Sequence, residues 1–86
     1  MVDIRMYCTA FCPYCVRAEM LLKSKGVKEI EKIFIDDMQN GFQELVRLTG
    51  RRTVPQIYIG EQHIGGYDDL AALDGRGGLD PLLATG

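Results

Sequence analysis

The stretch Ile4-Arg5-Met6-Tyr7-Cys8-Thr9-Ala10-Phe11-Cys12-Pro13-Tyr14-Cys15 decides the fold. Its first five residues are mostly apolar and include strong β-formers, so they predict a buried strand. Pro13 suits the first turn of a helix, where its missing backbone N–H is not needed. Apolar residues then recur on one helical face as far as Lys25. The chain therefore begins with a strand followed directly by a helix.

The rest of the sequence alternates in the same way. It predicts a strand at residues 31–36, a helix capped by Asp37 or Asn40 and ending at Gly50, strands at 56–59 and around 63–64, a helix at 68–73 and a last helical turn at 80–83. The order β-α-β-α-β-β-α combines a parallel β-α-β half with an antiparallel hairpin. We therefore expect an α/β fold in which a four-stranded mixed β-sheet is flanked by helices.

The composition limits the classes of protein to which the chain can belong. Its 86 residues suffice for one small domain, predicted to span residues 1–86. A formal net charge of −2 gives no electrostatic basis for binding a nucleic acid. No apolar run approaches the ~18 residues of a membrane span, and no secretory signal is visible. We expect a cytoplasmic protein without nucleic-acid or membrane partners.

Cys12 and Cys15 form a C-x-x-C directly after a strand and at the start of a helix, the context typical of a redox pair. Unpaired backbone N–H groups at the helix N-terminus favour the thiolate form of Cys12. Cys15 lies one turn further on and can close a disulfide with it. A static disulfide is the alternative interpretation. A zinc site is weaker still, because Cys8 and His63 are the remaining soft ligands, and we expect no metal.

Cys8 and His63 lie outside this pair. At the end of a strand, Cys8 is expected to be a small buried hydrophobe, and the alternative is an accessory thiol prone to glutathionylation or dimer formation under oxidation. His63 follows a turn and is expected to be a surface residue without a role.

Two further segments are candidate binding sites. Beside a redox pair, a cis Val54–Pro55 bond in Thr53-Val54-Pro55 would turn the backbone of Val54 outward to pair with an extended peptide. A proline that merely begins a strand is the alternative. In Gly65-Gly66-Tyr67-Asp68-Asp69, backbone N–H groups at a helix start can hold a carboxylate, and Asp68 can hold an amine. The alternative is that these acids only cap the helix.

In their order and spacing, Cys12-Pro13-Tyr14-Cys15, Thr53-Val54-Pro55 and Gly65-Gly66-Tyr67-Asp68 resemble the three signature segments of a dithiol glutaredoxin. The likeness covers nearly the whole chain, and the tail at residues 72–83 resembles the small bacterial glutaredoxin 3 type. The resemblance implies a thioredoxin fold and a glutathione-dependent thiol–disulfide oxidoreductase with glutathione as cosubstrate. Glutathionylated or disulfide-containing proteins, with ribonucleotide reductase as one candidate, would be its partners, and we expect a monomer.

The resemblance also implies a role for each residue of these segments. Cys12 would take the glutathionyl group from a mixed disulfide, and Cys15 would resolve mixed disulfides with proteins. Val54 would pair with the cysteinyl backbone of glutathione, and Asp68 would hold its γ-glutamyl amine. The full set of residues implied to bind glutathione is Tyr14, Thr53, Val54, Pro55, Gly66, Tyr67 and Asp68.

One departure from the family pattern concerns Thr9, which stands where many members carry a lysine three positions before the nucleophilic cysteine. The contact with the glycyl carboxylate of glutathione then passes to Arg51 or Arg52, unless these arginines only form a solvated loop. Two other functions stay open: electrons supplied by a flavoprotein reductase, and an iron–sulfur cluster held between two chains. The segment Gly66-Tyr67-Asp68 disfavours the first, and Pro13 disfavours the second.

Overall fold

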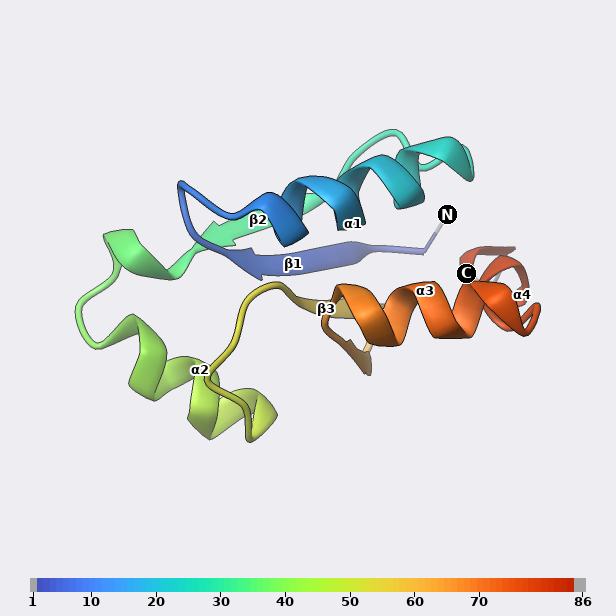
Figure 1. Cartoon of the computed structure of the whole chain (residues 1–86). Helices are drawn as coiled ribbons and strands as arrows, with labels where there is room; N and C mark the ends of the chain where they lie inside the picture. The colour runs from blue at the N-terminus through green and yellow to red at the C-terminus, as the bar shows by residue number, and fades with distance from the viewer. Residues whose placement is uncertain (1, 85–86) are drawn as a thin grey trace.

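A computed structural model describes residues 2–84. Its elements are, in chain order, strand β1 (Ile4–Cys8), helix α1 (Pro13–Ser24), strand β2 (Glu31–Phe34), 3₁₀ helix η1 (Ile35–Asp37), helix α2 (Gly41–Thr49), strands β3 (Gln56–Ile59) and β4 (Gln62–Gly65), and helices α3 (Tyr67–Gly75) and α4 (Leu79–Ala84). The strands form one sheet in the order β2-β1-β3-β4 (Figure 1). β1 is parallel to β2 and antiparallel to β3, and β3 is antiparallel to β4. The predicted mixed sheet is confirmed.

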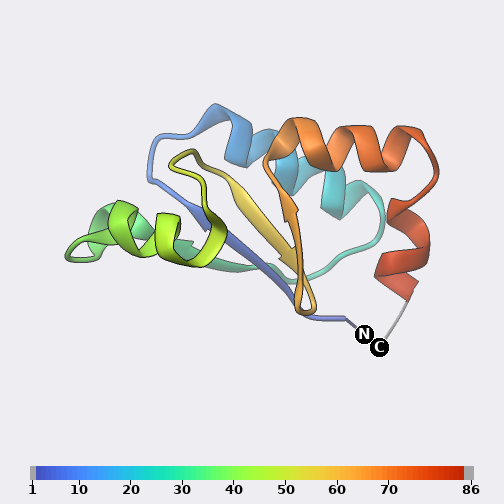
Figure 2. The same ribbon diagram turned by 90° about the horizontal axis from the view of Figure 1, so that it is seen from below.

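Helices cover both faces of this sheet, because successive side chains of a strand point to opposite sides. From β1, Ile4, Met6 and Cys8 enter the larger core cluster, which α1, α3 and α4 cover. Tyr7 points the other way and packs with Ile35 and with Leu45 of α2. Figure 2 shows α1 and α3 together on one side of the strands and α2 on the other. Within residues 2–84, no helix is long and apolar enough to cross a membrane.

Several boundaries differ from those predicted, and among them α3 runs to Gly75 instead of residue 73 and the last helix covers Leu79–Ala84 instead of residues 80–83. The strand expected at residues 31–36 ends at Phe34, because Ile35 begins η1 and is buried. α3 begins at Tyr67, one residue earlier than expected. Gly66, the residue before the helix, is joined to its first turn, since the backbone N–H of Gly66 donates to Oδ2 of Asp69 at 2.9 Å.

The start of α2 is tightly packed. Asn40 precedes the helix as predicted, but in the left-handed conformation with a φ of 58° and without a side-chain capping bond. The next residue, Gly41, is buried, and a Cβ placed there would overlap the backbone carbonyl oxygen of Ile35. A glycine is therefore required for η1 and α2 to pack together.

We predict that Gly41→Ala destabilises the protein by about 1–3 kcal/mol, because the backbone of Ile35 has to move. Gly75→Ala is the matched control, since Gly75 lies within α3 and no neighbouring atom lies within 4 Å of an added Cβ. Alanine there should leave the stability unchanged or raise it by up to ~1 kcal/mol. Urea unfolding followed by circular dichroism measures both, and an unchanged midpoint for Gly41→Ala would contradict this account.

Candidate redox site and binding groove

The two cysteines of the C-x-x-C lie at the start of α1. Cys12 immediately precedes the helix and Cys15 lies in its first turn, with their Cα atoms 5.2 Å apart, and the two side chains form a disulfide. Sγ of Cys12 accepts a hydrogen bond from the backbone N–H of Cys15 at 3.1 Å. A backbone N–H at a helix N-terminus stabilises a nearby anion, so this position favours the thiolate of Cys12 over the thiol once the disulfide is reduced.

Cys12 is largely buried, although the family resemblance implies that it is the attacking thiol. In this oxidised form, 9% of its surface is accessible to solvent and 5% of that of Cys15, because both pack against the larger core cluster. The preceding residue, Phe11, is 96% exposed. An incoming sulfur therefore meets a mostly buried Cys12 that follows an exposed aromatic residue in the chain.

Cys8 takes no part in the pair. It is a free thiol, 2% exposed, at the end of β1. Burial raises the pKa of this thiol above its usual value, and the nearby Lys32 opposes that effect without cancelling it. Cys8 is therefore protonated at neutral pH and packs in the core, which confirms the expectation of a buried hydrophobe.

A groove of about 340 Å³ brings the three signature segments together. All seven residues implied to bind glutathione contribute to its lining, which consists of Tyr14, Arg51, Thr53, Val54, Pro55, Gly66, Tyr67, Asp68 and Asp69. The Val54–Pro55 peptide bond is cis, as predicted. Of the two arginines considered, Arg51 lines the groove, whereas Arg52 is exposed outside this lining.

Asp69 joins two walls of the groove, a role that the sequence analysis missed. Its Oδ2 accepts hydrogen bonds from Nη1 of Arg51 at 2.7 Å and from the backbone N–H of Gly66 at 2.9 Å. These two bonds, with the Arg51 bond the stronger influence, hold the pKa of Asp69 below its usual value. Gly65 has a φ of +116°, and a Cβ there would overlap the Asp69 carboxylate. Gly65, the first residue of the segment Gly65-Gly66-Tyr67-Asp68, is the sequence signal that could have indicated this contact.

His63 was expected to be a surface residue without a role, and it makes a contact that the sequence analysis did not predict. The side chain is half-buried, and its Nε2 lies 2.8 Å from Oε1 of the fully buried Gln56. The same carboxamide reaches Thr53 in the groove wall. Gln56 and His63, which do not line the groove, are therefore linked to its wall by hydrogen bonds.

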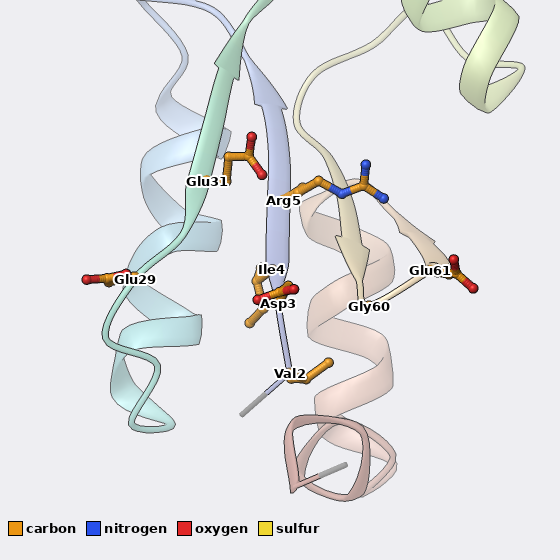
Figure 3. A pocket seen from close by; sticks show the side chains of 8 residues that line it. All are labelled: Val2, Asp3, Ile4, Arg5, Glu29, Glu31, Gly60 and Glu61. Carbon is orange, nitrogen blue, oxygen red and sulfur yellow. The ribbon is translucent and has the colours of Figure 1, made fainter. Parts of the chain in front are cut away.

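A second hollow, of about 400 Å³, lies at the opposite end of β1 (Figure 3). It is lined by Val2, Asp3, Ile4, Arg5, Glu29, Glu31, Gly60 and Glu61. Its carboxylates do not converge, since Glu29 and Glu61 point away to opposite sides. Within the described part of the chain, no group of three or more His, Cys, Asp or Glu side chains is placed to hold a metal ion.

A disulfide-forming C-x-x-C after the first strand of such a sheet, beside a cis-proline loop, defines a thiol–disulfide oxidoreductase of thioredoxin fold. The family model described as Glutaredoxin matches residues 4–64. The chain belongs to the glutaredoxin family, and its Cys12–Cys15 pair makes it a dithiol member that catalyses glutathione-dependent thiol–disulfide exchange.

Individual relatives agree with this assignment. The chain is 53% identical to Glutaredoxin 3 of Escherichia coli (strain K12) over 83 residues, which cover 96% of this chain and 99% of that protein. Among solved structures, the dithiolic glutaredoxin 2-C-Grx1 of Trypanosoma brucei brucei has a TM-score of 0.83 at 40% identity, covering 96% of this chain and 88% of that one. A buckwheat glutaredoxin–glutathione complex has a TM-score of 0.85 at 32% identity, covering 95% and 76%.

We predict that Asp69→Asn lowers the stability at neutral pH and that this difference disappears in acid. Asparagine still accepts from Gly66 but loses the charge that pairs with Arg51. Because the pKa of Asp69 is lowered in the folded state, its contribution is complete above the ordinary value of 3.8 and is lost as the pH falls through the lower, folded-state value. The pair is partly exposed, so the effect stays below ~1 kcal/mol.

Urea midpoints at pH 7 and at pH 2.5 measure this effect. Asp37→Asn, which changes an exposed acid of η1, is the control and should match the wild type at pH 7. A midpoint difference for Asp69→Asn that is equal at both pH values would exclude the charge as its cause.

Proposed function

We propose that the groove binds glutathione, so that the enzyme reduces glutathione mixed disulfides and protein disulfides at Cys12. The observation that carries this proposal is the groove itself, because segments far apart in the sequence line one hollow that includes Tyr14, the residue before Cys15. The buckwheat relative, whose structure is that of a complex with glutathione, supports the choice of ligand.

The charges of the groove suit the two ends of a tripeptide. At the start of α3, the N–H of Gly66 is already engaged by Asp69, so we assign the γ-glutamyl carboxylate to the N–H groups of Tyr67 and Asp68. The exposed Asp68 carboxylate would hold the γ-glutamyl amine. For the glycyl carboxylate we propose Arg51 rather than Arg52, since Arg51 lines the groove and one of its five N–H donors serves Asp69.

The middle of the ligand would lie along the cis-proline loop. There the backbone of Val54 would pair with the cysteinyl residue as an added strand does, with Thr53 and Pro55 on either side. In this placement the cysteinyl sulfur would face Cys12.

The chemistry then needs two steps. The Cys12 thiolate attacks the glutathione sulfur of a mixed disulfide, the substrate leaves as its thiol, and a second glutathione releases oxidised glutathione and regenerates Cys12. With a protein disulfide, Cys12 forms a mixed disulfide with the substrate. Cys15 then attacks Cys12, releases the reduced protein and leaves the Cys12–Cys15 disulfide, which two glutathione molecules reduce.

The proposal includes the setting in which the enzyme works. Regeneration by glutathione requires a reducing compartment, so we infer a cytoplasmic location. We also propose that residues 1–86 act as a single domain and as a monomer, without a metal. Proteins that carry a disulfide or a glutathionyl group would be the substrates, with ribonucleotide reductase as one candidate.

We predict that Cys15→Ser still removes glutathione from a glutathionylated peptide but loses at least 100-fold in the reduction of a protein disulfide, because the mixed disulfide with the protein is no longer resolved. Cys8→Ala, which changes the buried thiol outside the pair, is the control and should retain both activities. A coupled assay with glutathione and glutathione reductase measures both. Loss of both activities in Cys15→Ser would overturn the proposed division of roles.

We predict that the wild type prefers a glutathionylated peptide to the same peptide joined to cysteinylglycine, which lacks the γ-glutamyl residue. Asp68→Asn should reduce this preference about tenfold, equivalent to about 1.4 kcal/mol, since the charge that holds the amine is removed. Asp37→Asn should keep the preference. Ratios of kcat/KM for the two peptides test the proposal, which fails if the wild type treats them alike.

A further inference from the structure

We propose that Gln56, held in place by His63, is a positioning residue for the glutathione-binding loop Thr53-Val54-Pro55. This inference rests on the proposed function, because it explains how the wall of the groove that would pair with the cysteinyl residue is kept in place. Neither side chain lines the groove itself.

The hydrogen bonds of the Gln56 carboxamide define its orientation. Its Nε2 lies 3.0 Å from the backbone oxygen of Thr53 and 3.2 Å from Oγ1 of the same residue. A carbonyl oxygen only accepts, so Nε2 is the donor on this side and Oε1 is the acceptor on the other. Oε1 lies 2.8 Å from Nε2 of His63, which therefore carries the proton and donates it.

Burial makes this carboxamide unusual. Gln56 is 0% exposed and is the first residue of β3, a strand whose Ile57 and Ile59 are buried in the larger core cluster. An aliphatic side chain would fill the same volume without any need for partners, whereas a buried amide is stable only when its polar atoms are satisfied. The partners come from the groove loop on one side and from β4 on the other.

His63 is itself restrained. Its ring lies 5.0 Å from the ring of Tyr58, the residue opposite it in the β3–β4 pairing. The charged groups that act on it are Arg51 and Asp69 of the groove wall. Burial is the main influence that lowers the pKa of His63, so the ring is neutral at pH 7 and donates through the nitrogen that faces Gln56.

The chain of contacts ends at the backbone that would bind the ligand. Gln56 fixes the carbonyl and the hydroxyl of Thr53, which precedes Val54, and the ring of Pro55 restricts the backbone that follows. Val54 is therefore held from both sides in the orientation in which its N–H and C=O would meet an extended peptide. Loss of the Gln56 contacts frees one side of this loop and leaves Cys12 untouched.

Gln56→Met tests the proposal, since methionine has nearly the same length and volume but cannot replace these hydrogen bonds. We expect KM for a glutathionylated peptide to rise about tenfold, with kcat within twofold of the wild type. The reduction of the same peptide joined to cysteamine, which has no peptide group to pair with Val54, should keep its kcat/KM within twofold. Gln62→Met, an identical change at an exposed position of β4, is the matched control and should leave the kinetic constants for both peptides unchanged.

His63→Leu provides a second test that does not require a change in the core strand. It removes the donor to Oε1 of Gln56 and should raise KM for the glutathionylated peptide about threefold. The kcat/KM for the cysteamine peptide should again stay within twofold of the wild type. The double variant should be no worse than Gln56→Met alone, because both residues act through one contact with Thr53. If Gln56→Met does not fold, the kinetic constants of His63→Leu for the two peptides decide whether the proposal holds.

The outcomes separate this inference from the proposed function. An equal loss for both peptides, or no loss for either, overturns the positioning role of Gln56. If the wild type shows no preference for the glutathionylated peptide over the cysteamine one, the proposed function itself fails.

Discussion

The antiparallel pairing of β3 with both of its neighbours determines where the functional segments meet. Tyr7, near the end of β1, is paired with Gln56 at the start of β3, and Ile57 is paired with Gly65 at the end of β4. The loops that follow β1, precede β3 and follow β4 therefore lie at the same end of the sheet. These loops carry the cysteine pair, the cis-proline and the start of α3.

The sequence predicts the features that depend on local pattern. Strand and helix periodicity places the elements, and the C-x-x-C and the cis-proline loop are each contained in a few consecutive residues. The contact of Arg51 with Asp69 spans 18 positions, and that of Gln56 with His63 spans 7. Whether a polar side chain such as Gln56 is buried depends on partners that two other segments bring to it, and no local pattern contains that information.

The charges in the groove also depend on contacts between segments that lie apart in the sequence. Arg51 is paired with Asp69, so the two charges compensate each other, and Asp68 is left as the exposed acid at the start of α3. The pair also connects the loop before β3 with α3, and both residues line the groove. With Thr9 in place of a lysine, stabilisation of the Cys12 thiolate depends on the N-terminus of α1, where the N–H of Cys15 already faces Sγ.

On the proposed function, glutathione would lie in the surface groove at one end of the sheet. The proposed contacts at Val54 and at the N–H groups of Tyr67 and Asp68 use backbone groups, which any chain supplies. Backbone groups bind a peptide well only when they cannot move. Besides the cysteines and the proposed ligand contacts of Asp68 and Arg51, the side chains that matter are therefore those that immobilise backbone, Asp69 at Gly66 and, on our proposal, Gln56 at Thr53.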